Sequence, residues 1–160
     1  VIGFGQWWIY FDIVGQRMPR GDRGVLSAWL LSHLPIQLSI AASGAAIVSL
    51  VEHAHDAATP VGTAWLMGGS VAIGLVSLIV TARSLEDAKR IDVVYRPLAL
   101  VLALGAAAAV LVGVLDPAPW LLAVLLVAIL SVLWFFAIVR LIRAGAWRPR
   151  PTAEPARRST

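Results

Sequence analysis

The apolar residues of this chain come in continuous blocks of about 20 residues, and this spacing limits the fold more than any other feature. A helix rises about 1.5 Å per residue, so a block of this length spans the ~30 Å hydrocarbon core of a bilayer. Because the blocks are continuously apolar and not alternating, they exclude a β-barrel. We therefore predict an all-α fold, a polytopic transmembrane helical bundle. Its four complete helices cover residues 29–51, 61–82, 97–115 and 119–141.

The two ends of the chain differ from these blocks. Residues 1–11 are apolar but too short to span a bilayer, so we predict the end of a fifth, truncated helix there. The chain opens at Val1 inside this run, without the charged segment of a signal peptide, which predicts a missing N-terminal half of the same protein. Residues 143–160 are rich in Pro, Arg and Ala and cannot bury a core. We predict a disordered basic cytoplasmic tail there, after a transmembrane region over residues 1–142.

The placement of charge orients the predicted helices. Only 14% of the 160 residues are charged, against about 25% in a typical soluble domain. The net charge of +4 does not indicate nucleic acid, because the cations lie at the ends of apolar blocks. All 13 Lys and Arg residues fall within residues 12–28, 83–96 and 140–158, and the connections 52–60 and 116–118 hold none. By the positive-inside rule, we predict a multi-pass protein of the bacterial cell (plasma) membrane with a cytoplasmic C-terminus and the lipid bilayer as its partner.

Patterns of catalytic chemistry are missing from the sequence. The chain has no Cys, which excludes disulfides and thiolate metal sites. No nucleophile–base arrangement and no acidic pair inside an apolar block occurs. Gly3-Phe4-Gly5 lacks the strand and helix that surround a nucleotide fingerprint. We therefore expect a protein that is not an enzyme and needs no cofactor.

The block over residues 29–51 contains an unusual run, Ser32-His33-Leu34-Pro35-Ile36-Gln37. Pro35 cannot donate to the carbonyl of Leu31, so we predict that the helix kinks there or begins at Ser32 as an N-cap. His33 is a functional candidate because it is ionisable and close to a membrane segment. A structural hydrogen bond and a proton-relay or ligand role are both open for this side chain.

Asp12 is the second polar candidate, at the membrane face where His33 is also expected. It follows the aromatic segment Trp7-Trp8-Ile9-Tyr10-Phe11. Asp12 either pairs with a nearby Arg at the interface or forms a proton-responsive couple with His33 across two helices. A distance well over about 6 Å between the two side chains would exclude the couple.

The outer connection contains Glu52-His53-Ala54-His55-Asp56. A His-x-His pair flanked by carboxylates is able to hold a divalent metal. A solvated loop explains the same residues, and no second ligand cluster exists elsewhere in the sequence. We therefore predict no metal site, and His53 and His55 are the candidates if one exists.

Small residues recur at helical spacing in two blocks, where they would let helix backbones approach closely. Intramolecular packing and homo-oligomer contacts both explain them. These residues are Gly105, Ala109 and Gly113 in one block, and Ser70, Gly74 and Ser77 in another.

Two motifs in sequence order resemble the bacterial low temperature requirement protein A (LtrA) family. That family has a W-W-x-Y-F-D segment, a basic loop and an H-L-P segment that opens the next membrane helix. The matching residues are Trp7, Trp8, Tyr10, Phe11, Asp12, His33, Leu34 and Pro35. Glu52 and His55 resemble a Glu and a His near the outer end of that helix. The resemblance covers residues 5–56 and implies a polytopic bacterial membrane protein linked to growth in the cold.

The resemblance assigns no molecular activity, so three functions compete. A transporter or channel-like protein would need a polar pathway, to which Gln37, Ser39, Ser43 and Ser49 could contribute. Helical spacing places Ser39 and Ser43 on one face. The alternative is a non-catalytic membrane component for stress adaptation or interaction, and a membrane-embedded enzyme is the weakest hypothesis.

Overall fold

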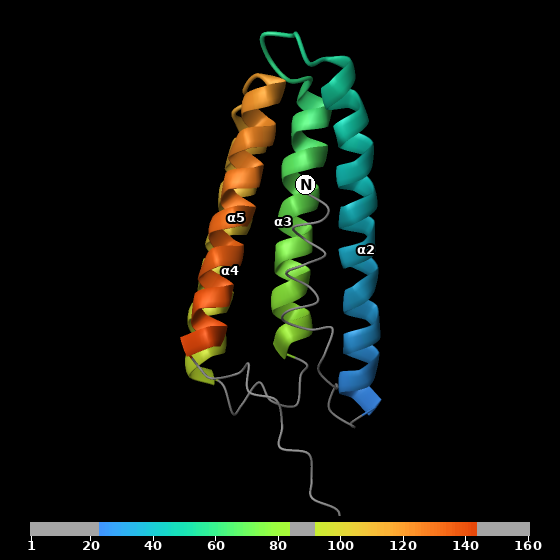
Figure 1. Cartoon of the computed structure of the whole chain (residues 1–160). Coiled ribbons are helices and arrows are strands. Elements are labelled where there is room, and N and C mark those ends of the chain that lie inside the picture. Colours follow the sequence, from blue (N-terminus) through green and yellow to red (C-terminus); the bar gives the residue numbers. More distant parts are fainter. Residues whose placement is uncertain (1–22, 84–91, 144–160) are drawn as a thin grey trace, which may run out of the picture.

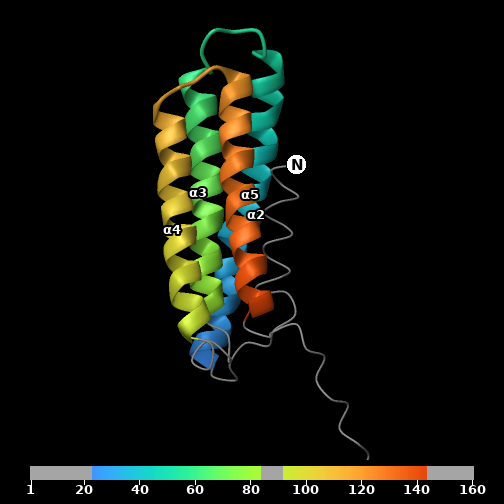
Figure 2. The same ribbon diagram turned by 60° about the vertical axis from the view of Figure 1, so that its left-hand side comes forward.

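The structure, a computed structural model, describes residues 23–83 and 92–143 as an antiparallel helical bundle. Each helix is long and apolar enough to cross a membrane, and the described residues form no strand. The predicted all-α transmembrane fold is therefore confirmed. Figure 1 and Figure 2 show the bundle from two directions. The helices are α2 (Arg23–Glu52), α3 (Val61–Arg83), α4 (Asp92–Val114) and α5 (Pro119–Arg143).

Two helices begin earlier than the sequence suggested. α2 begins at Arg23 and continues through Pro35, so Ser32 does not start the helix as an N-cap. Proline removes one backbone donor, and the remaining i to i−4 bonds carry the helix past it. α4 begins at Asp92 and likewise includes a proline, Pro97, near its start. The other helix ends lie within two residues of the predicted ones.

Several predictions fall on residues outside the described part of the chain. They concern the helix end over residues 1–11, the candidate Asp12 with the aromatic segment before it, and the tail after Arg143. The proposed couple between Asp12 and His33 therefore stays a prediction.

α3 is the central helix of the described bundle. It packs against α2 on one side and α4 on the other, and α5 packs mainly against α4. In α3, 61% of the most apolar segment is buried, against 28% in both α2 and α5. Any site that the described helices build inside the bundle therefore has α3 as one wall.

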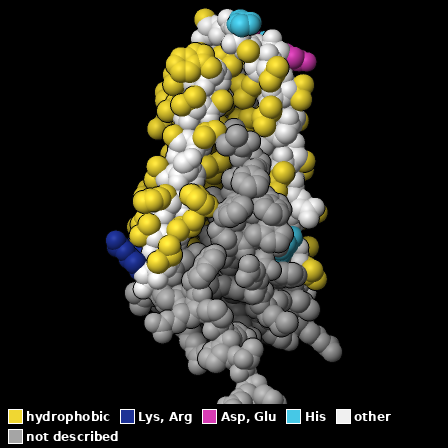
Figure 3. Space-filling model, viewed as in Figure 1, with side chains coloured by type: hydrophobic (Ala, Val, Ile, Leu, Met, Phe, Trp, Pro, Cys, Tyr) yellow, Lys and Arg dark blue, Asp and Glu magenta, His cyan; other side chains and the backbone are white. Residues whose placement is uncertain are grey.

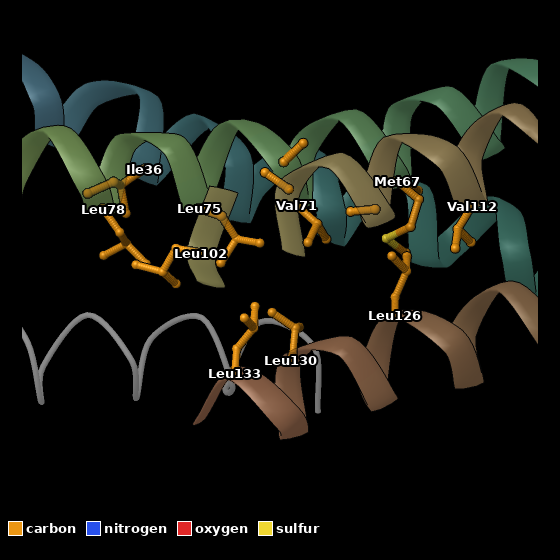
Figure 4. Packing of buried hydrophobic residues seen from close by; sticks show 14 of the residues in the cluster. Ile36, Met67, Val71, Leu75, Leu78, Leu102, Val112, Leu126, Leu130 and Leu133 are labelled. Carbon is orange, nitrogen blue, oxygen red and sulfur yellow. The ribbon is translucent and has the colours of Figure 1, made fainter. Parts of the chain in front are cut away.

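The core consists of aliphatic side chains from all the described helices. Met67, Val71 and Leu75 of α3 are fully buried at its centre. Figure 4 shows Leu126 of α5 pointing at Met67, with Leu130 one turn further along α5. The bundle is thus closed by side chains that interdigitate around α3.

The outer surface is apolar as well, as Figure 3 shows. Leu31, Leu104 and Phe135 are each exposed by 60% or more. A soluble monomer rarely exposes so extensive an apolar surface. Lipid is a solvent in which such side chains are not penalised, so this surface fits a bilayer.

Charged side chains gather at the two ends of the bundle, which Figure 3 shows as cations below and acidic side chains above. The antiparallel order of the helices places five arginines at one end: Arg23, Arg83, Arg96, Arg140 and Arg143. The guanidinium carbon of Arg140 lies 5.2 Å from the ring centroid of Phe136, one turn earlier in α5, in a cation–π arrangement. The opposite end carries Glu52 at the end of α2 and Asp56 and Asp116 in the connections. After the orientation that the charge pattern predicts, we call it the outer end and the arginine-bearing end the inner end.

Candidate functional site

Hydroxyl side chains gather between α2 and α3, and we call this set the hydroxyl seam. All of them are buried except Ser49, which is half-buried. Ser39 and Ser43 of α2 are four residues apart, and Thr63, Ser70 and Ser77 of α3 follow one another at intervals of seven residues. At these spacings each group lies on one face of its helix. The hydroxyl seam comprises Ser39, Ser43 and Ser49 of α2 and Thr63, Ser70, Ser77 and Thr81 of α3.

Two hydroxyl pairs join α2 directly to α3. The Oγ atoms of Ser43 and Ser70 are 2.8 Å apart, and both residues are less than 5% exposed. Ser70 gives its proton to the carbonyl oxygen of Met67, at 3.0 Å, so Ser43 is the donor to Ser70. Nearer the outer end, Ser49 Oγ and Thr63 Oγ1 are 2.7 Å apart. The polar contacts therefore fix the antiparallel register of α2 on α3.

Other hydroxyls of the seam bond to their own helix. Ser39 donates to the carbonyl of Ile36 at 2.7 Å, and Ser77 donates to that of Ile73 at 2.7 Å. Thr81 donates to the carbonyl of Ser77 at 2.8 Å. Serine and threonine in membrane helices commonly return a hydrogen bond to the preceding turn in this way. Each hydroxyl of the seam therefore has a partner and avoids the penalty of an unpaired buried donor.

A histidine lies near each end of the hydroxyl seam. At the outer end, Nδ1 of His53 is 2.8 Å from the carbonyl oxygen of Ser49, a residue of the seam. His33 lies ten residues before Ser43 in α2. At 1.5 Å per residue, His33 is therefore about 15 Å nearer the inner end than Ser43. The register set by Ser43 and Ser70 places the half-buried His33 at the level of Val80, next to Thr81.

Gln37 does not take part in the hydroxyl seam. Its side chain is exposed on the outside of α2, whereas Ser39 and Ser43 are buried against α3. The expected shared face of Ser39 and Ser43 is therefore present. Gln37 is two residues from Ser39, on the other side of a 3.6-residue turn, and a functional role for its side chain stays a prediction.

The opposite face of α3 meets α4 through glycine. A Cβ atom on Gly68 would lie 2.5 Å from the carbonyl oxygen of Ala109 and 3.1 Å from the Cα of Gly113. A Cβ atom on Gly113 would lie 2.9 Å from the carbonyl oxygen of Ala64. The two backbones touch here, and no side chain larger than hydrogen fits without a shift. Ala109 and Gly113 therefore take part in packing within the chain, which is one of the two explanations that the sequence left open for these small residues.

The sequence reasoning missed Gly68 and Ala64, the α3 half of this contact. The signal was present, because Ala64 and Gly68 have the same four-residue spacing as Ala109 and Gly113. Gly105 belongs elsewhere: a Cβ atom there would lie 2.7 Å from Leu133 of α5. The predicted row of small residues in α4 therefore serves two neighbouring helices.

Thr59 ties the two outer connections together, and we call this contact the outer latch. Its backbone N–H donates to the carbonyl oxygen of Pro117 at 3.0 Å, and its hydroxyl donates to the same oxygen at 2.5 Å. Asp116, which directly precedes Pro117, has a φ of 43°, and its Oδ1 is buried without a hydrogen-bond partner. The latch joins the start of α3 to the turn between α4 and α5.

The outer histidines do not form a metal centre within the described residues. His53 turns back toward α2, and His55 is exposed in the connection. Residues 23–83 and 92–143 contain no group of three His, Asp or Glu side chains placed to hold a metal ion. Among the motif residues, Leu34 is exposed and Pro35 is half-buried.

Comparison with known proteins gives one match. The sequence profile of a protein family described as "Bacterial low temperature requirement A protein (LtrA)" matches residues 1–134 of the chain. No curated protein and no solved structure matches.

Proposed function

The chain belongs to the bacterial low temperature requirement A protein (LtrA) family, and we propose that it is a transporter or channel-like protein of the bacterial plasma membrane. The hydroxyl seam carries this proposal. From Thr63 to Thr81 it extends over about 27 Å of helix, close to the thickness of the hydrocarbon core. Polar residues inside membrane helices are costly and often mark the path of an ion or substrate.

The chemistry of the hydroxyl seam suits protons and small polar solutes. A hydroxyl both donates and accepts hydrogen bonds, so a row of them can exchange partners with a passing group. His53 and His33 near the two ends add imidazoles, which take up and release protons. Five arginines lie at the end of the bundle opposite the outer latch, and they support an orientation with the arginine-bearing end in the cytoplasm.

One observation favours a second function, a non-catalytic membrane component for adaptation to cold or envelope stress. Every hydroxyl of the seam already has a partner within the protein. A saturated seam also suits a purely cohesive role, in which hydroxyls hold α2 on α3. The two functions differ in one measurable property, which is flux across a membrane.

Flux of protons into proteoliposomes tests the proposal. The purified full chain is reconstituted with a pH-sensitive dye trapped inside, and uptake is compared with that of empty liposomes. The Ser43→Ala/Ser70→Ala variant removes the central hydroxyl pair, and we expect it to lose most of the flux. Ser131→Ala is the matched control, because this α5 serine is exposed outside the seam. Wild-type flux no greater than that of empty liposomes would contradict transport and favour the second function.

A further inference from the structure

The two faces of α3 carry contacts that respond differently to movement. From them we infer that α2 is the moving element of the bundle, and that it shifts against a rigid unit made of α3, α4 and α5. The role of this movement as a gate rests on the proposed transport function. The movement itself does not depend on that function, because distances between helices can be measured without an assay of flux.

The contact of α3 with α4 resists movement because it is made by backbone atoms. The Ala109 carbonyl and the Gly113 Cα occupy the space beside Gly68 where a side chain would otherwise begin. A backbone carbonyl cannot rotate aside as a side-chain end does, so sliding or rotation of α3 on α4 creates a clash. The outer latch adds two hydrogen bonds from Thr59 to Pro117 and ties α3 to the turn before α5.

The contact of α2 with α3 allows movement because rotatable hydroxyls make its polar part. Ser43 and Ser49 reach α3 through Oγ atoms and not through their backbones. When such a pair separates, each hydroxyl can bond to a carbonyl of its own helix. Ser39 and Ser77 already bond in this way, and Ser70 bonds to Met67 while it accepts from Ser43. Separation therefore leaves no buried donor unpaired, which removes the main penalty for opening the interface.

Two further features agree with movement of α2, and each is shared with one other helix, since α5 is equally exposed and α4 contains Pro97. Only 28% of the membrane segment of α2 is buried, whereas α3 is the most buried helix of the described bundle. α2 also contains Pro35 between the inner end and the hydroxyl seam. A proline inside a helix removes a backbone hydrogen bond and is a common site of bending. Movement of α2 about this position would open the hydroxyl seam and leave α3 and α4 in contact.

Spin-label distances measure the movement without any assay of flux. The chain has no Cys, so labels attach only where Cys is introduced. Val48→Cys with Phe135→Cys reports on α2 against α5, and Leu104→Cys with Phe135→Cys reports on α4 against α5. All three positions are exposed, so the labels disturb no core contact. In liposomes we expect two populations or a broad distribution for the first pair and one narrow population for the second. Equally narrow distributions for both pairs would overturn the inference.

A reversible cross-link then connects the movement to transport. In Ala46→Cys/Met67→Cys, oxidation joins α2 to α3 at two buried positions outside the hydroxyl seam, which the register of Ser43 and Ser70 places opposite each other. We expect flux to fall to the level of empty liposomes and to return when reductant is added, while Ser131→Cys is unaffected by either treatment. Undiminished flux in the cross-linked protein would overturn the gating role. Distance changes without wild-type flux would leave the movement intact and refute the transport function alone.

Discussion

α3 contacts neighbouring helices along two faces, and the two faces make different kinds of contact. Toward α2, hydroxyl side chains form two pairs between the helices, at 2.7 and 2.8 Å. Toward α4, Gly68 and Gly113 bring the backbones together with no side chain between them. The residues that make these particular contacts are all small, and a hydropathy profile does not separate the two sets. The difference shows that small residues in a membrane helix serve either exchangeable hydrogen bonding or fixed steric contact, depending on whether they carry a hydroxyl.

We expect the largest loss of stability when the glycine contact between α3 and α4 is disrupted. In Gly68→Ala the new methyl group would lie 2.5 Å from a backbone carbonyl, so α3 and α4 must move apart. Overpacking of this kind costs about 1–3 kcal/mol, and a contact with backbone belongs at the upper end. The measurement is the free energy of unfolding in detergent micelles. Gly69→Ala is the control, because nothing lies within 4 Å of a Cβ atom there. An equal loss in both variants would refute the contrast between neighbouring glycines.

We expect the second largest loss of stability at the outer latch, which ties α3 to the turn between α4 and α5. Thr59 is 2% exposed, and Thr59→Val keeps the backbone hydrogen bond to Pro117 but removes the one from the hydroxyl. We expect a loss of about 1–1.5 kcal/mol in the free energy of unfolding, typical of one net hydrogen bond. Thr59→Ser retains the hydroxyl and should recover most of the loss. A stability unchanged in the valine variant would show that the hydroxyl does not hold the latch.

Gly105→Ala tests whether the glycine effect depends on what the methyl group meets. At this position the new atom would meet the end of the Leu133 side chain, at 2.7 Å, and not a backbone atom. Because a leucine can change rotamer, we expect a loss of about 1 kcal/mol, at the lower end of overpacking costs. The ratio of this loss to that of Gly68→Ala, measured under the same conditions, sharpens the comparison. A greater loss at Gly105 would contradict the steric argument.

The smallest effect is expected on the hydroxyl face. A double-mutant cycle with Ser43→Ala and Ser70→Ala isolates the energy of the pair from other effects of each substitution. Interhelical hydrogen bonds in membranes average about 0.6 kcal/mol, and we expect a coupling of that size. The cycle is measured by the same unfolding titration. A coupling above about 2 kcal/mol would exceed the range known for such bonds, and it would mean that α2 is not free to move.

The sequence predicted the helices because length and apolar character decide them locally, as at Val61–Arg83 and Pro119–Arg143. It also predicted the shared face of Ser39 and Ser43 from spacing alone. It could not assign partners, because spacing identifies a face and not the neighbour that covers it. For that reason Gly105 and Gly113, in one predicted row, contact two different helices. Gly68 was missed although its spacing was visible, because its importance depends on a backbone approach from α4.

The anchoring contacts of α3 are concentrated toward the end of the bundle opposite the arginines. Ala64 and Gly68 lie in its first two turns, beside Gly113 near the end of α4, and the outer latch lies just beyond them. These contacts hold α3 to α4 and to the turn before α5, and α2 takes no part in them. From Pro35 to its end at Glu52, α2 forms an arm about 26 Å long at 1.5 Å per residue. A tilt of a few degrees at Pro35 would therefore be amplified to a displacement of more than an ångström at the end of α2.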